Sequence, residues 1–265
     1  MKKISKIYMA LVLLFLYLPI FVLIVFSFNE TKSRSVFSGF TFDWYIKLFK
    51  NELILMSLRN TLIVSVSAAV IATLLGTVAA IGINAMRKPV KAAILNITNI
   101  PIINPEIVTG VSLMLLFVFF AARMNFEFGF GTLLIAHITF NVPYVILNVM
   151  PKFRQMNPHL YEAAQDLGCS PVKAFFKVVL PEILPGVVSG FLMSFTFSLD
   201  DFIISYFTSG ATSQTLPITI YSMTRRKVSP EINALSTIIF VVVVVVLITK
   251  NIAENKASKK EAIRR

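Results

Sequence analysis

The sequence predicts an all-α integral membrane protein with six transmembrane helices. Of its 265 residues, 56% are hydrophobic and only 14% are charged, whereas a soluble domain carries about 25% charged residues. The apolar residues are gathered into runs of roughly 20, the length of helix that crosses a bilayer. The single cysteine, Cys169, excludes an internal disulfide and a multi-cysteine metal site. We expect neither a metal site nor catalytic residues.

The first predicted span covers residues 7–28 and follows a short N-terminal segment, 1–6, that is rich in lysine. A basic stretch before an apolar run is also typical of a secretion signal. This run is longer than the apolar part of a signal peptide, and no small-residue cleavage site follows it. We therefore expect a retained membrane span.

The next segment, 29–60, is the longest predicted external one, and its aromatic residues suit a helix at the level of the lipid headgroups. A second span rich in small residues follows, which allows close helix packing in lipid. The third span begins irregularly, around Pro101 and Pro105. With the first span, the transmembrane domain covers 7–252, and its later spans lie at about 61–86, 93–122, 132–150, 183–209 and 232–252.

The distribution of Lys and Arg predicts the orientation. Most of these 25 residues lie in the N-terminal segment, in the connections after the second and fourth spans, and in a basic tail, 253–265. Cytosolic segments are enriched in Lys and Arg, so both termini are predicted to be cytosolic. Because the charges suit anionic membrane lipid, the net charge of +12 does not require a nucleic-acid partner.

The loop between the fourth and fifth spans carries the most informative pattern. Asn157 can cap a helix with Pro158 in its first turn, and Gly168 stands where a left-handed C-terminal cap belongs. Ser170 can then cap a second short helix that begins at Pro171. We expect both helices to lie parallel to the membrane. A DNA-binding helix-turn-helix is an alternative, but a recognition helix held between two spans has little freedom to enter a groove.

This loop, 151–182, also resembles a known signature. Its relevant residues are Glu162, Ala163, Ala164, Gly168, Val178, Leu180 and Pro181. Together they are similar to the coupling motif of permease subunits of bacterial ABC importers, which usually have Ile in place of Val178. The resemblance implies a type I ABC importer permease fold, with coupling helices between spans four and five. It also implies that Glu162 holds the loop by polar contacts, that the two alanines permit close approach of an ATPase, and that Gly168 supplies the turn.

The chain has no phosphate-binding loop of its own. None of its ten glycines belongs to a G-x-x-x-x-G-K-[ST] sequence. The resemblance implies two copies of a cytosolic ABC ATPase that bind the ATP, a second homologous permease subunit and an external binding protein. It also implies a location in the bacterial inner membrane. We therefore expect a transport subunit that is not an enzyme and that holds no cofactor.

Three acidic residues fall at membrane depth: Glu106 early in the third span, and Asp200 and Asp201 late in the fifth. A carboxylate inside a bilayer is costly unless it faces water or a partner, so a functional role is the default interpretation. The alternatives are a structural salt bridge and a residue that already lies at the membrane interface. Carboxylates with aromatic faces suit an organic ammonium ion. The aromatic residues that flank the aspartates are Phe195, Phe197, Phe202, Tyr206 and Phe207.

Further stretches are similar to the second permease subunit of spermidine/putrescine importers. They are residues 105–108, 136–140, 198–202, 216–223 and 228–235. The resemblance implies a polyamine cargo and an external polyamine-binding protein. We expect Glu106, Asp200 and Asp201 to lie on the cation path, with Tyr206 and Tyr221 as looser candidates.

Three other functions stay open from the sequence. An ion-gradient-driven secondary carrier of organic cations would also use buried acids and His137, although no inverted repeat is visible. An ABC permease for a different cargo would share the same architecture. A scaffold for another membrane enzyme, which itself transports nothing, is the third.

Overall fold

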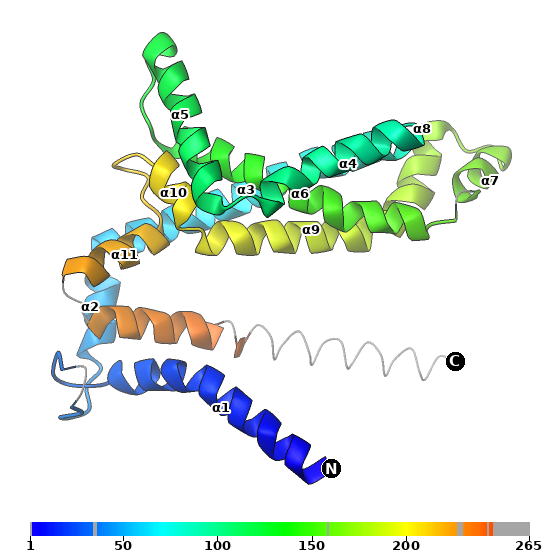
Figure 1. The fold of residues 1–265 in the computed structure, drawn as a ribbon. Coiled ribbons are helices and arrows are strands. Elements are labelled where there is room, and N and C mark those ends of the chain that lie inside the picture. Colours follow the sequence, from blue (N-terminus) through cyan, green and yellow to red (C-terminus); the bar gives the residue numbers. More distant parts are fainter. Residues whose placement is uncertain (1, 34–35, 158, 227–229, 243, 246–265) are drawn as a thin grey trace. The chain divides into compact units, whose positions relative to one another are not determined.

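The structure is a computed structural model that describes residues 2–33, 36–157, 159–226, 230–242 and 244–245, and these residues are mostly helical (Figure 1). Among them, the only β pairing is an isolated bridge between Asn29 and Phe40. The chain divides into two compact units. One combines Met1–Leu55 with Ile220–Arg265, and the other is Met56–Thr219.

The first unit contains α1 (Lys2–Phe26), α2 (Asp43–Lys50), the start of α3 (Glu52–Ala85) and the apolar helix Pro230–Val242. In the most apolar stretch of α1, no residue is buried inside the chain, which leaves the surface of this stretch to lipid or to another protein. The predicted external segment folds back on itself. The Nε1–H of buried Trp44 donates to the backbone oxygen of Asn29 at 2.7 Å, and the Asn29 side chain accepts from the Ser38 N–H at 2.9 Å.

The second unit is built around α6 (Phe130–Gln155) and α9 (Leu180–Asp200), which run side by side (Figure 1). Glycines allow this close approach. A Cβ atom on Gly186 would lie 2.7 Å from the carbonyl oxygen of Asn148, and one on Gly190 would lie 3.1 Å from the Val145 Cα. The buried core residues here are Ala72, Ala80, Ile83, Val145, Ile146, Val149, Met150, Phe153, Val179 and Ile183.

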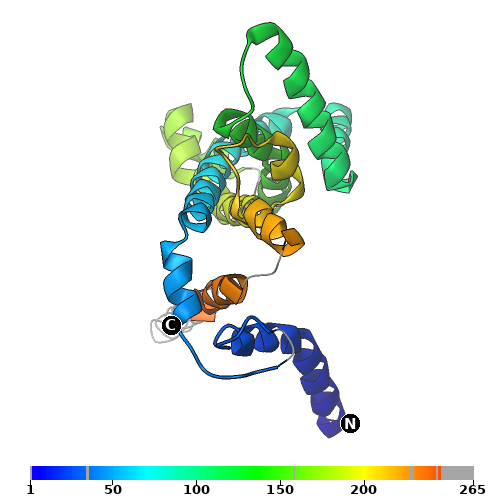
Figure 2. The ribbon, with the colours of Figure 1, turned by 90° about the vertical axis from the view of Figure 1, so that its left-hand side faces the viewer.

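Shorter helices surround this pair. They are α4 (Lys88–Ile103), α5 (Glu106–Met124), α7 (Leu160–Asp166), α8 (Pro171–Ala174), the π-helical turn η1 (Phe175–Val179), α10 (Ile203–Thr208) and the first residues of α11 (Leu216–Arg226). Helix α5 projects away from α6 and α9 in both views (Figures 1 and 2). The short helix α10 packs against both α5 and α6.

Within the part of the chain that the structure describes, five helices are long and apolar enough to cross a membrane: Ser5–Phe26, Glu52–Ala85, Glu106–Met124, Phe130–Gln155 and Pro171–Asp200. They correspond to the first five predicted spans, with three differences. The helix of the second span, α3, begins at Glu52, inside the segment 29–60 that was predicted to be external. The third predicted span is divided into α4 and α5, and the helix of the fifth begins well before 183 and stops at Asp200. For the sixth predicted span the described residues contain only the shorter apolar helix Pro230–Val242, and residue 243 and the part beyond 245 lie outside them, so this span stays a prediction.

The packing of α9 on α6 generates the first prediction. Gly186→Ala places a methyl group against the backbone of α6, which must move, so we expect a loss of about 1–3 kcal/mol of stability. The measurement is the thermal unfolding midpoint of the purified protein. Gly82→Ala in α3 is the control, because a Cβ atom there meets nothing within 4 Å. Equal midpoints for the two variants would contradict the proposed close contact.

Candidate functional site

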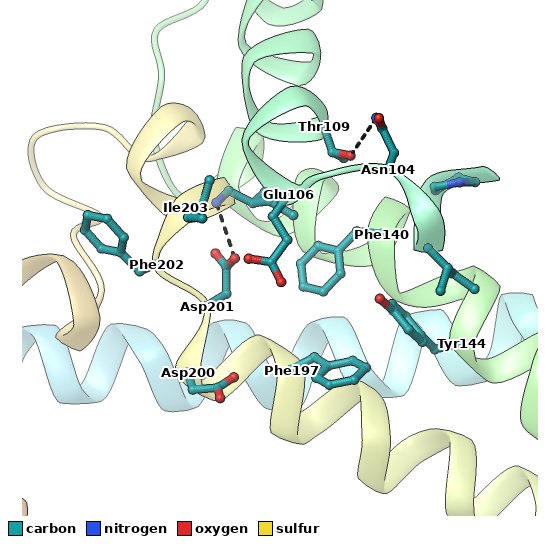
Figure 3. Close-up of a pocket in the computed structure, with 13 residues that line it drawn as sticks. Asn104, Glu106, Thr109, Phe140, Tyr144, Phe197, Asp200, Asp201, Phe202 and Ile203 are labelled. Carbon is teal, nitrogen blue, oxygen red and sulfur yellow. Dashed lines mark hydrogen bonds between the residues drawn. The ribbon is translucent and has the colours of Figure 1, made fainter. Parts of the chain in front are cut away.

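A cavity of about 470 Å³ lies in the second unit, where α4, α9 and the starts of α5 and α10 meet α6 (Figure 3). The helical structure is interrupted twice at its wall, once between α4 and α5 and once between α9 and α10, and these two helix breaks form part of the wall. Its lining residues are Pro101, Ile102, Asn104, Glu106, Thr109, Phe140, Tyr144, Phe197, Asp200, Asp201, Phe202, Ile203 and Ile204. The cavity therefore brings together the three acids that the sequence places at membrane depth.

The first break lies at Asn104 and Pro105. Proline has no N–H to donate to the carbonyl group four residues earlier, and its ring disfavours helical angles in the residue before it. Asn104 accordingly has an extended backbone, with φ −71° and ψ 136°. Glu106 becomes the first residue of α5, where the positive end of the helix dipole favours a carboxylate. This is why the predicted span 93–122 is not one continuous helix.

The second break follows Asp200, the last residue of α9. Asp201 has an extended backbone, and its carboxylate accepts hydrogen bonds from the N–H groups of Ile204 at 3.3 Å and Ser205 at 2.7 Å. It therefore caps α10. The break replaces the single helix predicted for 183–209, because this side chain offers the backbone an alternative to continuing the helix.

The three carboxylates differ in their surroundings. The side chain of Asp201 is only 6% exposed, and its carboxylate already accepts hydrogen bonds from the N–H groups at the start of α10. Glu106 and Asp200 are exposed in the isolated chain, and neither has an ion-pair partner among the described residues. Asp200 also ends its helix, where the dipole disfavours negative charge.

Aromatic rings make up much of the rest of the wall. The rings of Tyr144 and Phe197 meet edge to face with centroids 4.6 Å apart, and Figure 3 shows them beside the acids. Phe197 and Phe202 belong to the aromatic set named from the sequence, whereas Phe140 and Tyr144 were missed. Their spacing of four residues in α6 puts them on one helix face, a signal that was available in the sequence.

No Lys, Arg or His belongs to the described residues that line this cavity. Figure 3 shows the carboxylates of Glu106 and Asp201 pointing toward one another. Several negative charges at short range in a medium of low dielectric raise one another's energy unless a cation lies among them. The arrangement is therefore suited to an organic cation, whose charge the carboxylates balance and whose apolar part the rings cover.

The two tyrosines predicted on the cation path lie elsewhere. Tyr206 is on α10, is 54% exposed, and packs against Phe202 and Phe207, but it does not line the cavity. Tyr221 is on α11 in the other unit, where the Arg225 guanidinium lies 5.0 Å from its ring centre. A contact of either residue with a cargo stays a prediction.

The second candidate site is the segment around α7. As predicted, Gly168 adopts the left-handed conformation, with φ 84°. Its N–H donates to the Gln165 oxygen at 2.8 Å, and the N–H of Cys169 donates to the Ala164 oxygen at 3.0 Å, which together form a Schellman cap. The helix begins at Leu160, later than expected, and Pro158 lies outside the described residues.

The side chains of this segment divide into buried and exposed sets. Ala164 is packed inside the chain, whereas Ala163 and Glu162 are exposed, and Glu162 lies 3.3 Å from His159 Nδ1. Leu167 is 87% exposed at the turn. The sequence reasoning missed this leucine, although an apolar residue directly before a turn glycine is unusual at a solvated tip. Ala163, Glu162 and Leu167 are thus among the exposed residues of this segment.

The second half of the segment differs from the prediction. Ser170 caps the following helix, with its Oγ accepting from the Lys173 N–H at 3.4 Å, but this helix does not end before the fifth span. It continues through η1 and α9 as one helical run, Pro171–Asp200. Pro181, next to Leu180 in the first turn of α9, has no N–H to complete an α-helical turn, which explains the π-helical turn just before it.

A sequence comparison places the chain among known transport proteins. The model of the family described as "Binding-protein-dependent transport system inner membrane component" matches residues 72–255. The spermidine/putrescine transport system permease protein PotC of Haemophilus influenzae is 36% identical over 249 residues, which are 94% of this chain and 95% of the relative. The putrescine transport system permease protein PotI of Escherichia coli is 36% identical over 236 residues, 85% of this chain and 81% of the relative.

Solved structures share the fold at lower sequence identity. A bacterial ABC transporter involved in the import of the acidic polysaccharide alginate matches with a TM-score of 0.70 and 14% identity, over 96% of this chain and 95% of that one. The alginate transporter in complex with its alginate pentasaccharide-bound periplasmic protein also has a TM-score of 0.70, with 20% identity over 94% and 93%. These structures support the ABC importer permease fold.

The cap formed by Asp201 generates the second prediction. Asp201→Ala frees the N–H groups of Ile204 and Ser205, and loss of such a cap costs about 1 kcal/mol. Amide exchange in α10 should therefore become roughly fivefold faster by hydrogen–deuterium exchange mass spectrometry. Asp200→Ala is the matched control, since Asp200 is adjacent and exposed and is not part of this cap. Equal exchange in both variants would show that the carboxylate is not the cap.

Proposed function

Since the chain belongs to the family of binding-protein-dependent transport system inner membrane components, we propose that it forms half of the pathway through which an ATP-driven importer moves polyamines. Its relatives named above are permeases for spermidine/putrescine and for putrescine. An external binding protein would deliver the cargo. The chain would be a transport subunit of the bacterial inner membrane, with both termini cytosolic as the charge distribution predicts.

The observation that carries this proposal is the cavity with three carboxylates and no basic residue among its described lining. A polyamine is a chain of ammonium groups separated by methylene groups. The carboxylates can pair with the ammonium groups, while Phe197 and Tyr144 can cover the methylene groups or a charged end. The shared fold does not decide the cargo. The structural neighbour named above is involved in the import of an acidic polysaccharide, which the carboxylates of this cavity would repel.

The proposed energy coupling runs through the segment around α7. Residues Pro171–Asp200 form one helical run of 30 residues, about 45 Å long at 1.5 Å per residue. One end of this run adjoins Gly168, and the other ends at Asp200 in the cavity wall. A partner that moves the α7 segment would therefore displace an acid that faces the cargo.

We assign ATP to partner subunits, because the chain contains no phosphate-binding loop. The proposed complex contains two copies of a cytosolic ABC ATPase and a second homologous permease. No resident cofactor is required of this chain. The test of the whole proposal is uptake of radiolabelled spermidine and putrescine by cells with and without the chain. Uptake that persists without ATP but with a proton gradient would instead support a secondary carrier.

The exposed acids of the cavity generate the third prediction. Glu106→Gln and Asp200→Asn each remove one charge with little change in volume. Loss of a charge-assisted contact costs about 1.5–3 kcal/mol, so we expect uptake to fall roughly tenfold or more at limiting polyamine. Glu127→Gln is a control acid that does not line the cavity. Normal polyamine uptake by the Glu106→Gln/Asp200→Asn double variant would show that these two acids do not bind the cargo.

The α7 segment generates the fourth prediction. Gly168→Val forces a β-branched residue into a left-handed conformation, and Glu162→Lys reverses an exposed charge. Both should abolish uptake and the stimulation of ATP hydrolysis by loaded binding protein in proteoliposomes, while cargo binding to the free binding protein stays unchanged. Gly131→Ala, where a Cβ atom meets nothing within 4 Å, is the control. Full stimulation in both variants would exclude coupling through this segment.

A further inference from the structure

A fully buried histidine lies behind the acidic cavity. His137 is on α6, and its Nε2 lies 3.0 Å from the Ser205 Oγ and 3.5 Å from the Asp201 Oδ2. Its other ring nitrogen, Nδ1, is buried without a hydrogen-bond partner among the described residues. The ring also meets Phe140 edge to face, with centroids 5.3 Å apart. His137 does not line the cavity, so the proposed cation path does not use it.

The chemistry of the neighbours sets the role of this imidazole. An ionised carboxylate can only accept, and Nε2 is the ring nitrogen near the Asp201 oxygen. With the proton on Nε2, the imidazole donates to the Ser205 hydroxyl at 3.0 Å and directs the positive end of this N–H bond toward the Asp201 carboxylate, 3.5 Å away. The same carboxylate accepts from the N–H groups of Ile204 and Ser205, and these donors surround it on the protein side. Asp201 is thus held in the wall, unlike the exposed Asp200.

The contact also fastens α10 to α6 at one end. At the other end of α10, the Thr132 hydroxyl donates to the Thr208 backbone oxygen at 2.7 Å. The outer face of α10 packs on α5, where a Cβ atom on Gly110 would lie 3.0 Å from the Phe207 ring. Because α5 starts at Glu106, the position of α10 affects the acids on both sides of the cavity.

We propose that His137 is a positioning residue for cargo passage, which acts through Asp201 and Ser205 to hold the α9–α10 break and the cavity wall in place. The proposal rests on the proposed function for its transport readout only. It separates the roles of the two aspartates: Asp201 builds the wall, whereas Asp200, with Glu106, faces the cargo. From the sequence alone, all three acids were expected to share one role on the cation path.

The test compares His137→Leu with His137→Gln in the complete transport complex. Leucine removes the donor and keeps most of the volume, whereas the glutamine side-chain amide can place an N–H near the position of Nε2. We expect uptake to fall roughly tenfold in His137→Leu and to recover to at least about half in His137→Gln. Thr139→Val, on an exposed position of the same helix, is the control for insertion and folding.

A second readout does not depend on the cargo. Hydrogen–deuterium exchange of residues 203–208 should become roughly fivefold faster in His137→Leu than in Thr139→Val, because the cap of α10 loses its support. A double-mutant cycle adds specificity. His137→Leu should have little further effect on exchange in an Asp201→Ala background, where the acceptor is gone, and its full effect in an Asp200→Ala background.

The possible results separate the two proposals. Faster exchange with rescue by Gln supports the positioning role, even if the parent complex imports no polyamine and the proposed function fails. Unchanged exchange in His137→Leu overturns the positioning role, whatever the uptake shows. Equal effects of His137→Leu in the two aspartate backgrounds also overturn it, because the histidine would then not act through Asp201.

Discussion

Hydrocarbon offers no hydrogen-bond partner to a backbone N–H or C=O group, and this constraint governs where the helices of this chain can break. The two breaks at membrane depth both lie in the wall of one cavity. At the second break, Asp201 accepts from two N–H groups of α10. Side chains of the second unit also satisfy the neighbouring helix ends: Thr132 donates to the Thr208 oxygen at the end of α10, and the Thr61 hydroxyl accepts from the Leu216 N–H at the start of α11, at 2.7 Å. Irregular backbone is therefore concentrated at the site.

The same breaks explain the unusual charge of the cavity. A helix that ends inside the membrane exposes its terminal groups, and both breaks carry an acid next to an end. Glu106 and Asp201 stand at the starts of helices, where the dipole stabilises a carboxylate, whereas Asp200 stands at the end of one, where it does not. A bound cation therefore stabilises the ionised form of Asp200 more than that of the other two acids. An importer must also release its cargo.

The sequence predicted the first five apolar helices, because a run of roughly 20 apolar residues has few alternatives to a membrane helix. It also predicted the Gly168 turn and the Ser170 cap, which depend on adjacent residues. It did not predict the contact of His137 with Asp201 and Ser205, because these residues are far apart in the chain and no local pattern joins them. Nor did it predict that the second short helix would continue into α9, since the π-helical turn lets the chain pass Pro181 without ending the helix.

This π-helical turn has a mechanical consequence for coupling. An uninterrupted α-helix would transmit both translation and rotation from the α7 segment to Asp200, whereas a π-helical turn is a local weak point where a helix can bend. Beyond it, α9 is held on α6 by the close contacts of Gly186 and Gly190. Movement at α7 is therefore expected to bend the run near 175–179 before it slides α9 along α6. If the proposed coupling holds, the acids of the cavity would then respond to large displacements of the α7 segment and not to its small fluctuations.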